Sequence, residues 1–242
     1  MKRIFLISII LLCVQMLFAQ ATFISKGKIE FERSVNVWAN FKGSFADQLK
    51  KAIPQYQKSY FNYEFDNNKS IYGPGRESDS KATSFFGAPA TDNEIYSDYT
   101  TDKSIAHKNV FEKSFLIEDS LRKAKWKITN DFREIAGFNC RRATTIIMDS
   151  VFVVAFYTDE ITIPGGPESF NGLPGMILGL VINRLHTTWY ATKIDVNSVN
   201  VKDITPPTKG KKTTNSEVLE TLKKSLSDWG NYAARNIWAV MI

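Results

Sequence analysis

The chain has 242 residues, of which 43% are hydrophobic and 23% are charged, with 13 glycines, 8 prolines and 2 cysteines. These values are close to those of ordinary globular proteins, so they exclude a disordered, collagen-like or disulfide-dense chain. The 31 Lys and Arg residues exceed the 25 Asp and Glu residues by six, and the basic residues are scattered. We therefore expect no binding to nucleic acid.

The first residues are typical of a secretory signal peptide. Lys2 and Arg3 form a short positive region, residues 4–18 are almost entirely apolar, and Ala19 and Ala21 fit the small-residue pattern of a cleavage site. The apolar run is shorter than the ~20 residues that span a bilayer, and no second run of that length follows. We expect cleavage after Ala21, or alternatively after Ala19. The mature protein would be exported, in the periplasm or associated with the outer membrane, and not transmembrane.

Cleavage leaves Cys140 as the only cysteine, because Cys13 lies within the signal peptide. Cys140 lacks a partner for an internal disulfide and lies in an apolar-patterned strand, so we expect a buried thiol, with a free reactive thiol as the alternative. The two histidines, His107 and His186, have no carboxylate or cysteine at metal-ligand spacing. We therefore expect no metal site and no cofactor.

The N-terminal half of the mature chain combines strand patterns with polar stretches. An apolar face at helical spacing, followed by Pro54, predicts a short helix over residues 44–53 with Ser44 as its N-cap. Residues 67–92 are rich in Asn, Ser, Gly and charged side chains, which predicts a long surface loop. Alternating apolar residues predict four strands, over residues 27–38, 56–65, 94–101 and 110–118.

The second half has the strongest β pattern. Residues 161–175 contain three prolines and four glycines and cannot form a regular element. Apolar residues at helical spacing over 215–235 predict one amphipathic helix packed on the sheet, with a membrane-surface helix as the alternative. Runs of β-branched and aromatic residues predict strands over 126–129, 135–147, 151–157, 176–183 and 187–196.

These elements predict an α+β fold with one domain over residues 22–242. A sheet of about eight to eleven strands must curl or split into two layers to bury its apolar face. We expect a curved antiparallel sheet, a half-barrel resembling the periplasmic lipoprotein carriers in architecture, closed around one or two helices. The alternative is a β-sandwich with the C-terminal helix across one end.

The sequence GPESFNGLPGMIL at residues 166–178 resembles the signature of the GLPGLI family, exported proteins found mainly in Bacteroidetes. Residues 126–128 and 135–143 resemble the tryptophan strand of that family and its glycine-aromatic-x-cysteine-x-basic-alanine segment. Residues 155–161 resemble its aromatic-tyrosine segment, although Phe156 replaces a common tryptophan. The resemblance covers most of the mature chain and implies a single GLPGLI-type domain over 22–242. It implies no reaction, because the family has no established activity.

The signature itself predicts a sharp corner, because proline fixes φ near −65° and glycine permits a positive φ. In one interpretation the corner folds a loop over the end of the sheet and plugs it with Phe170 and Leu173. In the other, the loop is a gate or anchor for an apolar ligand or partner. The motif residues are Gly166, Pro167, Gly172, Leu173, Pro174 and Gly175.

We expect a non-enzymatic envelope protein that binds an apolar or amphipathic ligand, or an outer-membrane protein partner. Binding would use the concave, aromatic-rich face of the sheet and the Gly/Pro loop. A purely structural component, with a filled sheet interior and an exposed apolar patch, is a further alternative. The candidate binding residues are Tyr157, Phe170, Leu173, Pro174 and Met176.

A periplasmic hydrolase is the alternative function. It would use His186, or the carboxylates of Glu160 and Glu168, as acid and base. No nucleophile motif or phosphate-binding loop accompanies these residues, so we assign no catalytic residue.

Overall fold

The computed structural model describes residues 23–41, 43, 46–78, 89–197, 199 and 201–242. The predicted signal peptide, residues 1–21, and the predicted helix cap Ser44 lie outside this part of the chain.

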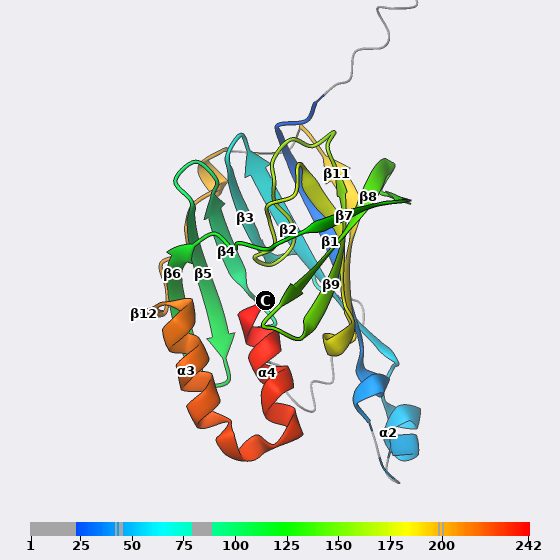
Figure 1. Ribbon diagram of the computed structural model, residues 1–242, viewed down its shortest axis with the longest axis vertical. Coiled ribbons are helices and arrows are strands. Elements are labelled where there is room, and N and C mark those ends of the chain that lie inside the picture. The colour runs from blue at the N-terminus through cyan, green and yellow to red at the C-terminus, as the bar shows by residue number, and fades with distance from the viewer. Residues whose placement is uncertain (1–22, 42, 44–45, 79–88, 198, 200) are drawn as a thin grey trace, which may run out of the picture.

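A single sheet of twelve strands dominates the described residues (Figure 1). Its strand order is β12-β6-β5-β4-β3-β2-β1-β11-β10-β9-β8-β7. Neighbouring strands are antiparallel, except that β12 runs parallel to β6. The strands are β1 (Lys26–Asn36), β2 (Tyr56–Asp66), β3 (Lys69–Pro74), β4 (Glu94–Asp98), β5 (Lys103–Val110), β6 (Lys113–Ser120), β7 (Lys127–Ile135), β8 (Phe138–Ile147), β9 (Val151–Thr158), β10 (Met176–Ile182), β11 (Thr187–Asp195) and β12 (Lys211–Thr213).

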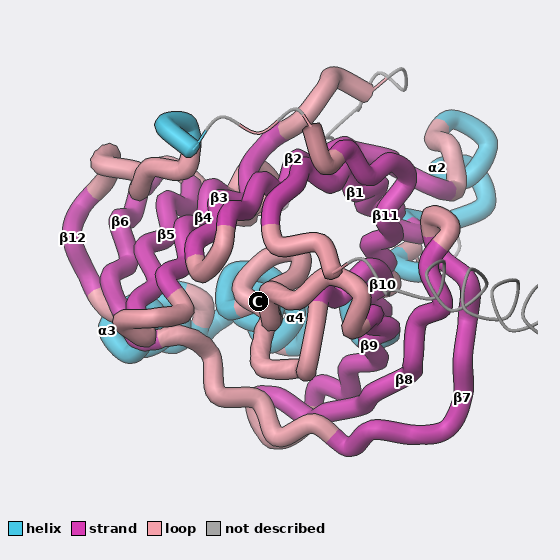
Figure 2. Tube along the Cα trace, turned by 90° about the horizontal axis from the view of Figure 1, so that it is seen from above, coloured by secondary structure: helices cyan, strands magenta, loops and turns pink. Residues whose placement is uncertain are grey.

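The sheet is strongly curved. Figure 2 shows the strands following one curved wall, with the β9–β10 loop and the end of the chain inside the curve. The connection between β6 and β7 crosses the open side. The predicted α+β fold with a curved antiparallel sheet is confirmed, with twelve strands rather than eight to eleven. The described strands form one continuous sheet, so the sandwich alternative is wrong.

Alternation along each strand divides the sheet into a concave and a convex face, because successive side chains point to opposite sides. Ile29 and Phe31 of β1 are fully buried, and so is Trp189 of the neighbouring strand β11. These side chains join a single core cluster that also contains Phe170 and Leu173 of the β9–β10 loop. The concave face is therefore filled by the chain itself.

The segment 67–92 is not the long loop that its composition predicts, because β3 lies within it. Asn67 and Asn68 form the turn between β2 and β3, and Asn67 has a φ of 52°. An Asn pair between two strand-like runs is a hairpin signal, since asparagine tolerates positive φ. The strand β5 was also missed, because its polar residues mask the pattern.

Helices occupy one end of the molecule (Figure 1). The single helix predicted over 215–235 is wrong: α3 (Asn215–Ser225) and α4 (Asn231–Met241) are separate, with Gly230 at a φ of 52° between them. The predicted short helix is confirmed as α2 (Ala46–Ala52). None of the described helices is long and apolar enough to cross a membrane. The short 3-10 turns are η1 (Val37–Asn40), η2 (Asn183–Leu185), η3 (Val201–Asp203) and η4 (Ser227–Trp229).

Candidate functional site

The Gly/Pro loop between β9 and β10 lies inside the curved sheet (Figure 2). Its corner has the predicted backbone: Gly172 has a φ of +87° and Gly175 a φ of +142°. A Cβ atom at Gly175 would lie 2.0 Å from the backbone oxygen of Thr158, so only glycine fits there. Trp126 holds the loop from outside, because its Nε1 donates a 2.8 Å hydrogen bond to the backbone oxygen of Asn171.

The loop residues predicted to bind a ligand are mostly inside the core. Tyr157, Phe170, Leu173 and Met176 are all buried, whereas Pro174 is exposed. Phe170 and Leu173 fill the interior of the sheet, as the plug interpretation of the signature expects. An apolar ligand could reach the four buried residues only if the loop moved. Their role in binding remains a prediction.

Glu168, one of the predicted hydrolase carboxylates, belongs to a buried polar cluster. Its side chain is 3% exposed. It accepts a hydrogen bond of 2.7 Å from Nδ2 of Asn93 and one of 3.4 Å from the hydroxyl of Tyr72. The buried Lys108 and the half-buried Arg122 interact electrostatically with it. The carboxylate is thus a countercharge inside the fold.

Lys108 and Arg122 bind the end of α4. Lys108 Nζ donates to the backbone oxygens of Val240, at 2.8 Å, and Ile242, at 3.2 Å, and Arg122 Nη2 donates to that of Met241. The last carbonyls of a helix have no partner within the helix, and cations stabilise this negative end. Burial lowers the pKa of Lys108 to about 8 and that of Arg122 to about 10. The two cations therefore hold α4 in the concave interior.

The structure does not bring the hydrolase candidates together. Glu160 is exposed just after β9, and His186 is exposed at the turn between η2 and β11. In the described part of the chain, neither is a hydrogen-bond partner of the Glu168 carboxylate. Cys140 is buried, as predicted, and burial raises its pKa to about 12, so the thiol stays protonated and is a poor nucleophile.

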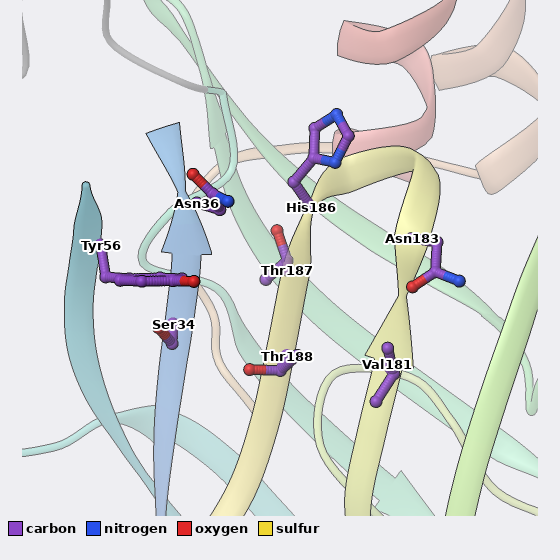
Figure 3. A pocket seen from close by; sticks show the side chains of 8 residues that line it. All are labelled: Ser34, Asn36, Tyr56, Val181, Asn183, His186, Thr187 and Thr188. Atoms are coloured by element: carbon purple, nitrogen blue, oxygen red, sulfur yellow. The ribbon is translucent and has the colours of Figure 1, made fainter. Parts of the chain in front are cut away.

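The convex face carries an open hollow that the sequence analysis did not identify (Figure 3). Its volume is about 360 Å³. The strand ends β1, β2, β10 and β11 surround it, together with the η2 turn. We call this site the convex hollow. It is lined by Ser34, Asn36, Tyr56, Val181, Asn183, His186, Thr187 and Thr188.

Backbone pairing fixes the position of these side chains. Ser34 and Thr188 are directly opposite each other in the pairing of β1 with β11, and Asn36 is opposite Tyr56 in the pairing of β1 with β2. The backbone nitrogen of Asn36 donates a 2.9 Å hydrogen bond to the backbone oxygen of His186. His186 has a φ of 52°, which lets the chain turn from η2 into β11.

Most polar side chains of the convex hollow form no hydrogen bond with the described residues. Oδ1 of Asn36 is a buried acceptor without a hydrogen bond, and an unpaired buried polar group costs about 1–3 kcal/mol. Tyr56 is 52% exposed. Figure 3 shows its ring edge-on, reaching from β2 across β1 between Ser34 and Asn36. Among the described residues, no side-chain hydrogen bond is formed by Ser34, Asn36, Tyr56, Asn183 or Thr188.

The convex hollow could not be found from the sequence by spacing. Its residues come from four strands and one turn, and polar residues at strand ends resemble an ordinary solvated surface. His186 was singled out, but for a catalytic role. The only local signal is Tyr56, an aromatic residue on the outward-facing side of a strand whose inward side carries Phe61, Tyr63 and Phe65.

Comparisons with known proteins relate this fold to an N-glycanase. Two solved structures of PNGF-II are similar, in the P21 and C2 space groups. The first has 14% sequence identity and a TM-score of 0.53, and the match covers 84% of this chain and 33% of that chain. The second has 13% identity and a TM-score of 0.52, with coverages of 88% and 32%. The chain thus spans about a third of PNGF-II, and the likeness is one of fold.

A search among curated proteins gives no match. The family model for the N-glycanase peptide, N-terminal domain, matches residues 90–223, which run from just before β4 into α3. Because this match extends over more than half of the sequence, the chain belongs to the family of N-glycanase peptide N-terminal domains.

Proposed function

We propose that this protein is an exported, non-enzymatic binding module that holds its ligand in the convex hollow. The proposal is carried by four polar side chains around Tyr56 that form no side-chain hydrogen bond with the described residues: Ser34, Asn36, Asn183 and Thr188. A small-molecule site typically combines an apolar or aromatic surface with a few polar groups that fix the ligand. The concave face is filled, whereas the convex hollow is open to solvent.

A binding role agrees better than catalysis with the placement of the ionisable groups. Glu168 is enclosed by Tyr72, Asn93 and two cations, and the convex hollow contains His186 as its only ionisable side chain apart from Tyr56. An acid-base reaction needs two such groups within hydrogen-bond reach of one substrate. In the described chain, no observation favours the hydrolase alternative over binding.

The family supports a recognition role. Its name describes the N-terminal domain of an N-glycanase, and this chain resembles about a third of PNGF-II. A domain of this size can contribute recognition to a larger activity. Export to the periplasm or outer membrane remains part of the proposal and depends on the predicted signal peptide. Membership of the GLPGLI family likewise remains a prediction.

The competing site is the concave face. There the Gly/Pro loop would contact an apolar ligand or an outer-membrane partner. It requires the loop over 161–175 to open, because Phe170 and Leu173 are packed in the core. The two sites lie on opposite faces of the sheet and can be distinguished by mapping.

The test is an NMR screen of the chain without residues 1–21. Amide shifts are recorded while mixtures of polar and apolar small molecules are added. We expect ligands to perturb the amides of His186 and Thr188, and Tyr56→Ala to abolish these perturbations. Perturbations confined to residues 161–176 would instead favour the concave site, and an absence of ligands at the convex hollow would overturn the proposal.

A further inference from the structure

Three exposed aromatic side chains lie at the helical end of the molecule. Phe111, Trp229 and Tyr232 are 48%, 47% and 71% exposed. Phe111 lies in the turn between β5 and β6, Trp229 is the last residue of η4, and Tyr232 lies in the first turn of α4. The ring centroids of Phe111 and Trp229 are 5.6 Å apart. Two segments that are far apart in the sequence thus present one aromatic surface, which we call the aromatic tip.

The backbone at Phe111 is unusual for a residue in such a turn. Phe111 and Glu112 form the two-residue loop between Val110 and Lys113, which pair across β5 and β6. Such loops need a positive φ, which glycine and asparagine adopt readily, and here Phe111 has a φ of 55°. A bulky side chain in this region strains the backbone, and such strain is concentrated at functional positions. A strained residue with a half-exposed ring is expected where the ring contacts a molecule outside the fold.

Lysine side chains surround the aromatic tip. Lys113 begins β6 directly after the turn, and Lys223 and Lys224 lie in the last turn of α3. All three are exposed, and none forms an ion pair with the described residues. The exposed acidic residues beside the aromatic rings are Glu112 and Asp228. The three lysines therefore leave this end of the molecule with a small positive excess.

This composition favours the interface of a lipid bilayer over the surface of another protein. Protein interfaces are enriched in aromatic residues but depleted of lysine. Membrane interfaces combine Trp and Tyr with Lys, whose apolar stem lies beside the rings while its ammonium group reaches the lipid phosphates. The aromatic tip also lies at a helix end and a turn, at one end of the molecule, and not on a flat face of the sheet (Figure 1).

We propose that the aromatic tip binds the surface of a bilayer that contains anionic phospholipid. Trp229 and Tyr232 would lie at the level of the headgroups, and the three lysines would lie beside the phosphates. The apolar face of α3 is packed inside the protein through Val218 and Leu222, so α3 does not lie in the membrane plane. The inference goes beyond the proposed function and does not depend on it, because the aromatic tip and the convex hollow share no residue.

The experiment measures co-sedimentation of residues 22–242 with two kinds of vesicle, phosphatidylcholine alone and phosphatidylcholine mixed with phosphatidylglycerol. Residues 1–21 are omitted because their apolar run would itself bind lipid, and all described helices and strands lie in the part that is tested. Binding should be about tenfold tighter to the anionic vesicles and should weaken as salt is added. Equal binding to both kinds of vesicle, or binding to neither, would overturn the inference.

Substitutions at Trp229 test whether the aromatic tip makes the contact. Trp229→Ser should weaken binding to the anionic vesicles about tenfold, whereas Trp229→Phe should keep it within about threefold. The matched control is Phe132→Ser, because Phe132 is also an exposed aromatic residue, at 57%, but lies on the edge strand β7. It should leave binding unchanged. An equal loss in both serine variants would overturn the assignment to the aromatic tip. Thermal melts check that each variant is folded.

Fluorescence gives the location independently of affinity. Bromine atoms on the acyl chains quench a tryptophan that reaches them, so vesicles of brominated anionic lipid should quench the wild type. Most of this quenching should disappear in Trp229→Phe, although the other tryptophans of the chain remain. Full quenching in Trp229→Phe would overturn the inference. So would self-association that Trp229→Ser abolishes, if the wild type binds no vesicle, because the aromatic tip would then be a protein contact.

The strained turn provides a last test, in which stability and binding should change differently. Glycine suits a φ of 55°, so Phe111→Gly should not lower the melting temperature. It should nevertheless weaken binding to the anionic vesicles severalfold, because one of the three rings is lost. A lower melting temperature with unchanged binding would show that Phe111 serves only to pack against Trp229, and would overturn its role in the lipid contact.

Discussion

The two faces of this sheet differ in how they hold charged and polar side chains. In the concave interior, Glu168 and Lys108 are buried and Arg122 is half-buried, and each has identified partners. On the convex face, the side chains of Asn36 and Thr188 lie beside the exposed ring of Tyr56 and form no hydrogen bond with the described residues. A buried charge must be compensated for the chain to fold, whereas unpaired groups at a surface are free to bind a ligand. Interior substitutions should therefore affect stability, and substitutions in the convex hollow should affect binding.

The largest effect is expected for Glu168→Gln, which removes the carboxylate charge at nearly constant size. The buried Lys108 and the half-buried Arg122 would then lose their countercharge, which should lower the free energy of unfolding by about 3–5 kcal/mol. Urea unfolding measures this loss. The control is Glu160→Gln, which changes an exposed side chain and should stay within about 0.5 kcal/mol. Similar effects of the two substitutions would contradict the role of Glu168.

A somewhat smaller loss, about 2–4 kcal/mol, is expected for Gly175→Val. The new side chain would combine a strained φ of +142° with a clash against the backbone oxygen of Thr158. Gly172→Val is the comparison, because Gly172 also has a positive φ, but its Cβ would meet its nearest neighbour only at 3.9 Å. It should cost about 1–2 kcal/mol. Thermal melts that rank the two variants in the reverse order would show that the corner is not packed as described.

The lowered pKa of the buried Lys108 should make the free energy of unfolding depend on pH. Its pKa is about 8 in the folded protein, against an ordinary value of 10.5, so the unfolded chain binds more protons between these two values. The free energy of unfolding should therefore gain a contribution of about 1–3 kcal/mol as the pH rises from 8 to 10.5, and lose it as the pH falls again. Urea unfolding of the wild type and Lys108→Met at pH 7.5, 9 and 10 isolates this slope. Parallel curves for both proteins would exclude it.

The smallest effect on stability is expected in the convex hollow. Tyr56→Ala removes a half-exposed ring without partners, so the free energy of unfolding should change by no more than about 0.5 kcal/mol. The same variant should lose the ligand. Strong destabilisation by this substitution would mean that Tyr56 supports the fold, and the contrast between the two faces would disappear.

Much of the fold could be predicted from local patterns, because strand alternation and the Gly/Pro corner are properties of short segments. The predicted strands over 27–38 and 187–196 correspond to β1 and β11, which contain the buried Ile29, Phe31 and Trp189, and the segment 161–175 forms no regular element, as predicted. The strand β5 shows where this approach fails. Lys108 lies between Ala106 and Val110 on the inward face, so a charged residue occupies a core position. Lys108 can occupy this position because it donates hydrogen bonds to the backbone oxygens at the end of α4.

Two further features could not be predicted from local patterns: the convex hollow, and the break that separates α3 from α4. The amphipathic pattern continues through Leu226 and Trp229, although α3 ends at Ser225, Gly230 follows the η4 turn, and Trp229 is 47% exposed. The convex hollow depends on how four strand ends and a turn meet in space. Polar residues such as Ser34 and Asn183 can be recognised as lining a hollow only once that arrangement is known.

The open sheet has a further consequence for how the protein behaves at high concentration. Its two edges, β12 and β7, are not closed against each other, and unpaired strand edges invite pairing with other molecules and aggregation. Here β12 has only three residues, two of them lysines, while β7 contains a bulge between Ile128 and Phe132 and carries Asp131, Arg133 and Glu134. Short edge strands, bulges and charged side chains are the usual means by which natural sheets avoid edge-to-edge association. The two edge strands of this sheet combine all three.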